Sequence, residues 1–302
     1  MYLRRLGTVL SKAGNAWIDD HAQSMGAALS YYTVFSLAPL LLIAISVAGL
    51  VFGRDAAQGA VVDQLQGLIG QSSAEAIQGL LKNVSRPSEG IIATATGVAV
   101  LVIGATSVFA ELQDDLNRIW QVPTRQKTSS WWAWLRTRLL SIGMILAMGF
   151  LLLVSLAASA AFDAFAAWST SAIGGWEAVA HGVNFVVSFV LTTALFAMIY
   201  RFMPQATIEW RDVGIGALVT AALFSIGKFL IGLYIGKSAL ASGFGAAGSL
   251  AVLLAWVYYS AQIFLFGAEF TWAYAHAAGS RQGEVPAVAG GSPASAQAAP
   301  AR

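Results

Sequence analysis

The sequence predicts an all-α, polytopic membrane protein with six transmembrane helices and an extra amphipathic helical segment in the first outer loop. Of its 302 residues, 57% are hydrophobic and only 11% are charged, whereas a soluble domain carries about 25% charged residues. Six apolar runs reach the length of about 20 residues that a helix needs to cross a bilayer. Basic residues gather in alternate connecting segments. The predicted surroundings of most of the chain are therefore hydrocarbon.

Each apolar run is expected to cross the bilayer as a helix, because a helix satisfies its own backbone hydrogen bonds in lipid. Charge is rare within the runs: the fifth contains Lys228, and the sixth contains Glu269 near its end. The runs cover residues 29–52, 91–110, 139–162, 183–202, 213–235 and 247–270.

The distribution of Lys and Arg predicts the orientation. Most of the 17 basic residues lie in the N-terminal segment, in the loop between the second and third runs, in the turn between the fourth and fifth, and in the tail. Positive charge favours the cytoplasmic side. Both termini are therefore predicted to be cytoplasmic, in a multi-pass protein of the bacterial inner (plasma) membrane. Trp120, Trp210 and Trp272 fall at the predicted inner interface, as an aromatic belt requires.

Three regions are predicted along the chain. Residues 28–278 form the six-helix transmembrane domain, and residues 279–302 form a disordered cytoplasmic tail because they lack apolar surface to bury. Residues 1–27 form a cytoplasmic amphipathic segment on the inner membrane surface. Its apolar face consists of residues at helical spacing: Leu3, Leu6, Val9, Leu10, Ala13 and Trp17.

The first outer loop carries two further amphipathic patterns, separated by a break near residues 67–70. Each pattern is too short and too polar to span a bilayer. Two interpretations remain open: the two helices cap the outer mouth of the bundle, or they rest on the membrane surface.

Several classes of site are excluded by composition. The chain has no cysteine, which excludes disulfides, thiolate zinc sites and iron–sulfur clusters. Its three histidines, His21, His181 and His276, fall in separate segments, and no pair has metal-ligand spacing. The glycine pattern at residues 243–248 resembles a dinucleotide fingerprint, but it opens a membrane helix and follows no strand. We therefore expect no cofactor, no metal, no nucleic-acid partner and no enzymatic activity.

The first span opens with a polar row that is too rich for a lipid-facing surface. Two interpretations remain open: hydrogen bonds between helices, or a substrate path. Proline frees a backbone carbonyl one turn earlier, near Phe35, which a hydroxyl of the row or water in a cavity would satisfy. The residues are Ser30, Tyr31, Tyr32, Thr33, Ser36 and Pro39.

Lys228 is the single charge in mid-span, where charge is costly and usually functional. Asp163, Asn184 and Tyr32 are expected at similar depth as partners. The alternative is that the lysine extends its ammonium group to the nearby outer edge.

The sixth span carries Tyr258, Gln262 and Glu269. Tyr258 and Gln262 are four residues apart and share a helix face. Together with Lys228 and Tyr31 they are candidates for lining a polar interior, with structural hydrogen bonding between helices as the alternative.

The second helix is expected to continue into the cytoplasm with a charged motif: Glu111, Asp114, Asp115, Asn117 and Arg118. Asp114 and Arg118 have the spacing of an ion pair, whereas Glu111 and Asp115 are like charges at the same spacing. The motif is interpreted either as a solvated face or as a proton or ion entry site.

At these segments the sequence resembles the YihY/BrkB family of bacterial membrane proteins, once labelled ribonuclease BN. The matching stretches are residues 28–39, 111–120, Pro204 with 210–214, 243–250, and Trp256 through 267–269. Phe244 departs from the Tyr expected there. The resemblance implies a six-helix inner-membrane protein suspected of exporting lipids or small molecules, and the scattered histidines argue against a ribonuclease.

The leading functional hypothesis is therefore a transporter, exporter or flippase of a lipid-like or small amphipathic molecule, with membrane lipids as partners. No nucleotide-binding loop is present, so a gradient or a partner protein would supply the driving force. The alternative is a non-transporting envelope assembly or scaffold protein. The oligomeric state is left open.

Overall fold

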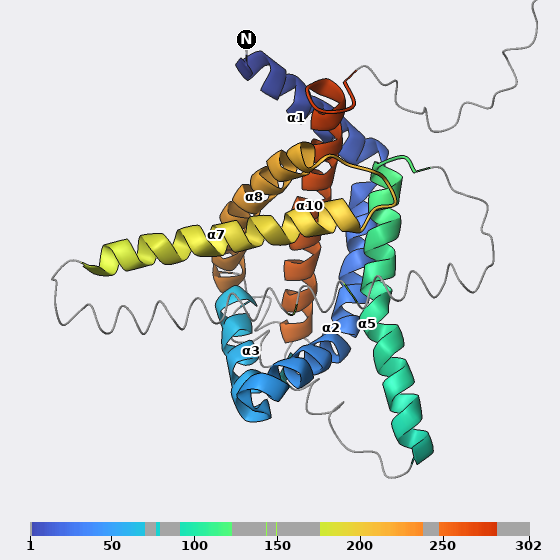
Figure 1. Cartoon of the computed structure of the whole chain (residues 1–302), viewed down its shortest axis with the longest axis vertical. Coiled ribbons are helices and arrows are strands. Elements are labelled where there is room, and N and C mark those ends of the chain that lie inside the picture. Colours follow the sequence, from blue (N-terminus) through green and yellow to red (C-terminus); the bar gives the residue numbers. More distant parts are fainter. Residues whose placement is uncertain are drawn as a thin grey trace, which may run out of the picture.

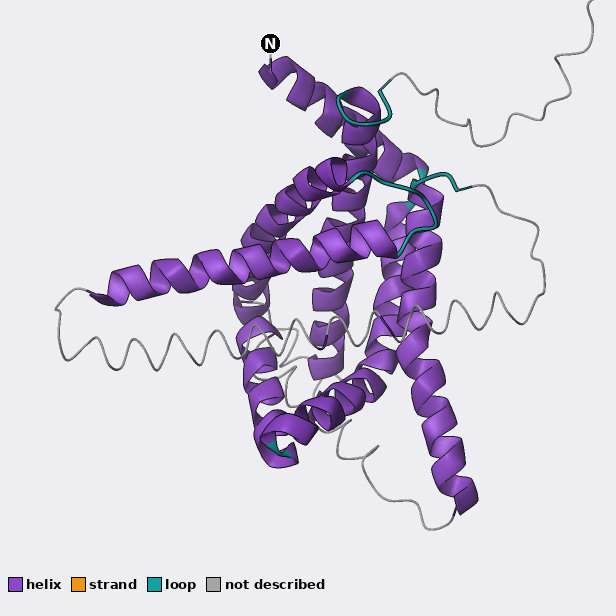
Figure 2. Cartoon of the chain, viewed as in Figure 1, coloured by secondary structure: helices purple, strands orange, loops and turns teal. Residues whose placement is uncertain are grey.

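The computed structural model describes residues 2–69, 77–78, 91–122, 143, 149, 176–237 and 248–282. Within these ranges the regular structure is α-helical throughout (Figure 2), which confirms the all-α prediction for the described part of the chain. The helices are α1 (Tyr2–Asp19), α2 (Ala22–Phe52), α3 (Arg54–Ile69), α5 (Ile91–Ile119), α7 (Trp176–Phe202), α8 (Trp210–Lys237) and α10 (Gly248–Ala277).

Five of these helices contain predicted apolar runs. The first, second, fourth and fifth runs fall within α2, α5, α7 and α8, and the sixth run falls within α10 from residue 248 onward, while nearly all of the third run lies outside the described residues. Among the described residues, three helices are long and apolar enough to cross a membrane, over Phe185–Phe202, Trp210–Ile231 and Leu250–Ala277. The total of six transmembrane helices remains a prediction.

Helix α10 is the central element of the described bundle (Figure 1). It packs against α8, α2, α1 and α5, while α2 also packs against α5 and α3, and α7 packs against α8. Helix α1 and the last turns of α10 lie at one end of the bundle, which we call the α1 end, and α3 lies at the opposite, α3 end.

The N-terminal helix is present as predicted, but its apolar face meets protein. Val9 and Ala13 are buried against Phe270 and Ala273 of α10. Part of the face that was expected to lie on the membrane is therefore an interhelical contact.

The first predicted outer loop begins with helix α3, which ends at Ile69, inside the predicted break. Its Ala57 is buried with Ile45 of α2 and Leu253 of α10. The second predicted helix of this loop lies outside the described residues except for Ile77 and Gln78.

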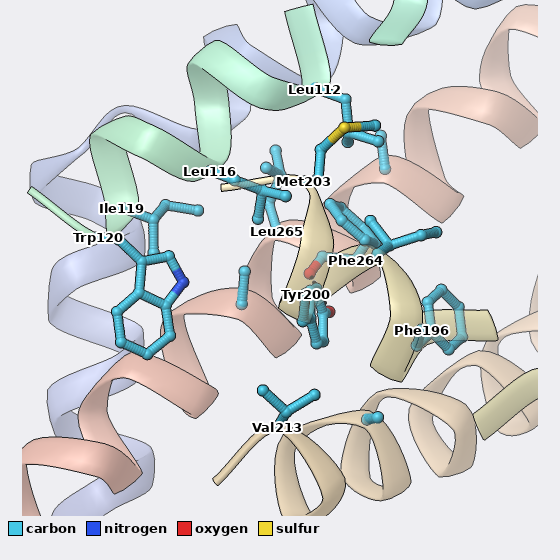
Figure 3. Packing of buried hydrophobic residues seen from close by; sticks show 14 of the residues in the cluster. Leu112, Leu116, Ile119, Trp120, Phe196, Tyr200, Met203, Val213, Phe264 and Leu265 are labelled. Atoms are coloured by element: carbon cyan, nitrogen blue, oxygen red, sulfur yellow. Dashed lines mark hydrogen bonds between the residues drawn. The ribbon is translucent and has the colours of Figure 1, made fainter. Parts of the chain in front are cut away.

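The largest apolar cluster fills the α1 end (Figure 3). It joins α2, α5, α7, α8 and α10, and Tyr200 of α7 lies at its centre with Phe264 of α10 on one side. Aromatic rings from three helices meet there: the ring of Phe196 lies 5.7 Å from Phe224 and 6.1 Å from Phe264 between centroids. The well-packed part of the molecule therefore surrounds the C-terminal half of α10.

Two glycine–threonine pairs fix the contact between α8 and α10. A Cβ atom on Gly216 of α8 would collide with Thr271 of α10, and a Cβ on Gly267 of α10 would collide with Thr220 of α8. Each threonine hydroxyl donates to the carbonyl of the glycine four residues before it, at 2.7 Å in both helices. The pairs are thus reciprocal, in the small-residue packing that brings membrane helices close together.

Candidate functional site at the α1 end of helix α10

The C-terminal half of α10 carries buried polar side chains on two faces. Glu269, only 1% exposed, follows Gln262 by two helical turns and points with it toward the α1–α2 side. Thr271, fully buried, faces α8. This polar layer lies within the stretch of α10 that is apolar and long enough to span a membrane.

Glu269 lies beside Asp20, the first residue of the turn between α1 and α2. Neither carboxylate oxygen of Glu269 has a hydrogen-bond partner at standard geometry among the described residues. The ionisable group beside Glu269 is thus another carboxyl, that of Asp20, and not a basic side chain. Burial raises the pKa of Asp20, and this rise is opposed by a hydrogen-bonding interaction with the Glu269 carboxyl, which falls short of standard geometry, and by the Arg118 guanidinium at the end of α5.

A left-handed turn places Asp20 at this position. His21, between α1 and α2, has φ 57° and ψ 42°, a conformation that is uncommon for residues other than glycine. Its backbone carbonyl accepts from the amide of Ser24 at 2.9 Å, and its ring nitrogen Nδ1 lies 3.2 Å from the carbonyl of Ile18. The chain thus turns sharply at His21, with the Asp20 carboxyl held against α10.

Gln262 connects α10 to the first turn of α2. Its Nε2 donates to the carbonyl of Ala22 at 3.4 Å, and a Cβ on Gly26 would occupy the place of this amide group. The Oε1 atom of Gln262 is buried without a partner among the described residues. This contact between α10 and α2 is of the kind expected if Gln262 forms structural hydrogen bonds between helices.

Tyr200 is a buried polar residue that the sequence analysis did not identify. Its hydroxyl donates to the carbonyl of Phe264 at 2.7 Å and lies 3.1 Å from the Thr220 hydroxyl. It thereby joins α7, α8 and α10 at one point (Figure 3). Nothing in the spacing of Tyr200 along α7 distinguishes it from the other aromatic residues of the run.

The other residues predicted to line a polar interior are not brought together. Tyr31 is 58% exposed and Tyr258 is 37% exposed; Lys228 and Tyr32 are exposed as well. Of the partners expected for Lys228, Asp163 and the side chain of Asn184 lie outside the described residues. The Tyr31 ring instead lies against Phe35 of its own helix, at 4.7 Å between centroids.

The hydroxyls of the first span bond within their own helix. Ser30 donates to Ala27, Thr33 to Leu29 and Ser36 to Thr33. Interhelical hydrogen bonding by these three hydroxyls therefore has no support among the described residues, and Thr33 and Ser36 donate to carbonyls other than that of Phe35. Short hydroxyl side chains in helices readily find a carbonyl one turn earlier. Pro39 lies inside α2 without ending the helix, and its side chain is not among those that the structure describes.

The charged motif of α5 divides into exposed and buried groups. Asp114 and Arg118 are exposed, Glu111 is half-buried, and Asp115 is buried with one oxygen unpartnered among the described residues. Asp115 lies beyond the predicted span, and burial, with the nearby Glu111 and Asp114 charges, raises its pKa from 3.8 to about 7. The interpretation of the charged motif as a solvated face is therefore wrong for Asp115, which is buried.

Two residues of the same segment anchor the connection between α7 and α8. The Asn117 side-chain oxygen accepts from the Gln205 amide at 2.7 Å, and Gln113 donates to the Met203 carbonyl at 3.0 Å. The role of Asn117 visible here is therefore to hold this loop at the α1 end.

The segment after α10 is also tied down at this end. Asp212, at the start of α8, accepts from the amide and hydroxyl of Ser280 at 3.0 and 2.6 Å. Arg281 donates to the Thr207 carbonyl at 2.8 Å and lies over the Trp120 ring. Ordered contacts continue past the predicted boundary at residue 279, and the rest of the predicted tail lies outside the described residues.

No group of three or more His, Cys, Asp or Glu side chains suited to a metal ion occurs in the described parts of the chain. Among these residues, the unpartnered Glu269 carboxyl with Asp20 beside it is the arrangement with the clearest chemical capacity. Two carboxyls in a poorly solvated place favour retention of a proton.

Comparison with known proteins identifies relatives of similar membrane character. UPF0761 membrane proteins match at 28% identity over 265 residues in Verminephrobacter eiseniae (strain EF01-2), covering 83% of this chain and 58% of the relative. The corresponding values are 29% over 262 residues, 84% and 58% in Stenotrophomonas maltophilia (strain K279a), and 28% over 260 residues, 83% and 55% in Ralstonia nicotianae.

The chain thus spans 55–58% of the length of these relatives. No solved structure matches it. The family model described as Virulence factor BrkB matches residues 14–289, a range that includes α2 to α10 and the polar layer around Glu269. The chain therefore belongs to the BrkB family of membrane proteins.

Proposed function

We propose that this protein is an inner-membrane transporter, exporter or flippase that moves a lipid-like or small amphipathic molecule. Membership of a family of membrane proteins supports this proposal, together with three helices of span length. The observation that carries it is Glu269, buried in one of those helices without a hydrogen-bond partner among the described residues. An ionisable residue that is buried in a helix of span length is costly and usually serves a function.

Lys228 contributes less to the proposal than its position in the sequence implied. Its side chain is exposed on α8, so it is compatible with an ammonium group extended to the membrane edge. The polar layer on α10 therefore replaces Lys228 as the main support for a path through the protein.

The proposed topology has six transmembrane helices with both termini in the cytoplasm. The packing of Val9 and Ala13 on Phe270 and Ala273 supports placing the N-terminal helix and the end of α10 on one side. Reporter fusions at the two termini test it: both should report the cytoplasm, and reporters on opposite sides would contradict the topology.

The transport proposal is tested in liposomes. The purified protein is reconstituted with fluorescent anionic phospholipids, and the rate at which the label becomes accessible to a membrane-impermeant quencher is followed. Protein-containing vesicles should show faster exchange than empty vesicles. Glu269→Gln, which keeps the size but removes the ionisable group, should slow the exchange severalfold. Glu209→Gln is the matched control, because Glu209 is an exposed carboxylate just before α8.

Equal exchange rates in protein-containing and empty vesicles, with lipids and with small amphipathic dyes, would rule out transport. A partner protein that co-purifies stoichiometrically under those conditions would then favour the assembly or scaffold role.

A further inference from the structure

The Asp20–Glu269 pair joins two parts of the chain that are far apart in sequence. Asp20 belongs to the junction between α1 and α2, and Glu269 belongs to the buried face of α10. Packing of α1 on α10, through Val9, Ala13 and Phe270, brings them together. Any change in the charge of this pair therefore acts directly on the contact between the N-terminal helix and α10.

The charges around the pair are few and unevenly distributed. Arg118 at the end of α5 acts on Asp20 and favours its ionised form, whereas Asp19 of α1 repels both carboxyls. His21 also acts on Asp20, and Lys12 of α1 is exposed. The sequence of α2 contains no charged residue, and Asp212 of α8 is engaged with Ser280.

These surroundings suit one negative charge on the pair and not two. Arg118 offsets a single charge, but a second would leave the buried Glu269 carboxylate without a donor among the described residues. Burying an unpaired carboxylate beside another carboxylate is costly. Retaining one proton removes that cost.

We infer that Asp20 and Glu269 together form a proton-binding site, and that the proton held there is the coupling ion of the transport cycle. The second half of this inference rests on the proposed function, whereas the first half does not. When the pair binds a proton its charge changes from −2 to −1, and the proton comes from water at the α1 end. When the proton leaves, the two carboxylates repel, and the α1–α2 junction separates from α10.

Proton binding is tested on the purified full-length protein by infrared spectroscopy of the carbonyl band of protonated carboxyl groups. All variants are made in an Asp115→Asn protein, because Asp115 is another buried carboxyl that would contribute to the band. The band should disappear as the pH is raised, and Glu269→Gln should remove the intensity of one carboxyl group. Asp20→Asn should move the remaining titration to lower pH, because a neighbouring negative charge is gone. Glu209→Gln should leave the band unchanged.

A band that lacks this one-carboxyl component, or that is identical in Glu269→Gln and Glu209→Gln, would overturn the proton site. Should Glu269→Gln fail to fold, the shift expected in Asp20→Asn decides the question, and an unshifted titration overturns the site.

Coupling is tested separately in the liposomes. A pH gradient across the membrane should change the rate of net transport severalfold in the unmodified protein, and in neither Glu269→Gln nor Asp20→Asn. Transport that proceeds at the same rate with and without the gradient overturns the coupling role. An intact infrared titration in a protein that transports nothing refutes the proposed function and the coupling role while the proton site stands.

Discussion

The two ends of the bundle are held together by different means. At the α1 end, a large apolar cluster is combined with side-chain hydrogen bonds between separate segments: Gln205 donates to Asn117, Ser280 to Asp212 and Tyr200 to Phe264. At the α3 end, the described contacts are apolar: a smaller cluster of Val34, Ile45, Ala57, Ile77 and Leu253.

This difference indicates at which end of the bundle the helices are held in a fixed position relative to one another. Apolar packing alone tolerates exchange of similar side chains, whereas a hydrogen bond requires two particular partners. The α1 end is therefore the more precisely ordered of the two. The Glu269 carboxyl, with neither oxygen hydrogen-bonded at standard geometry among the described residues, and the one unpartnered oxygen of Asp115 both lie in this more ordered region.

The largest effect expected from this comparison is a pH dependence that originates at the α1 end. Asp115 binds a proton more tightly in the folded protein, with its pKa raised from 3.8 to about 7. The stability it contributes is complete below pH 4 and is lost as the pH rises through 7. Each pKa unit corresponds to about 1.4 kcal/mol, so the loss is on the order of a few kcal/mol.

Asp115→Asn should flatten this dependence, which is measured as the midpoint of thermal unfolding in detergent across the same pH range. The matched control is Asp55→Asn, at an exposed carboxylate on α3, and it should keep the slope of the unmodified protein. If the unfolding midpoint depended on pH equally in all three proteins, the pH dependence would not originate from Asp115 at the α1 end.

Deletion of buried leucine side chains should give the next largest effect on stability. Leu265 and Leu253 are both almost fully buried in α10, one at each end. Leu265→Ala should lower the free energy of unfolding by about 3 kcal/mol and Leu253→Ala by about 2 kcal/mol, in the lower part of the range for buried leucines. Lipid is as apolar as the core, so only packing is lost.

The difference between the two leucines arises because hydrogen-bonded neighbours at the α1 end are less able to collapse into the cavity. Denaturant unfolding in a single detergent measures both variants. A larger loss for Leu253→Ala would reverse the comparison.

The smallest effect concerns two glycines of α8. Gly216→Ala places a methyl group against Thr271, whereas at Gly214 there is nothing within 4 Å. Overpacking costs about 1–3 kcal/mol, and alanine gains about 0.5–1 kcal/mol over glycine in a helix. Gly216→Ala should therefore unfold at lower denaturant concentration, and Gly214→Ala at equal or higher concentration. Identical midpoints would show that the close contact of α8 with α10 is unimportant.

The helices could be predicted from the sequence because uninterrupted apolar runs have a physical minimum length in lipid. The extension of α5 beyond the predicted apolar run to Ile119 followed from its charged motif and apolar face. Their partners could not be predicted. Gly216 and Thr271 are separated by dozens of residues, and nothing in either run indicates that they meet.

The candidate site was predicted only in part for the same reason. Glu269 was identified because it is an ionisable residue at the end of an apolar run, but Asp20 depends on the turn at His21 and on the packing of α1. Lys228 follows Ala221 by seven residues, so helical spacing gives both the same face. Ala221 is buried and Lys228 is exposed, and only the placement of neighbouring helices decides between these outcomes.

The reciprocal glycine–threonine contact also limits how the two helices can move. Helices α8 and α10 run in opposite directions, with Gly216 opposite Thr271 and Thr220 opposite Gly267. A slide by one turn, about 5.4 Å, would set threonine against threonine or leave two glycines facing each other across a void. A slide of one helix along the other by a turn is therefore unfavourable in both directions. The relative motion that remains for α8 and α10 is a rocking about this contact.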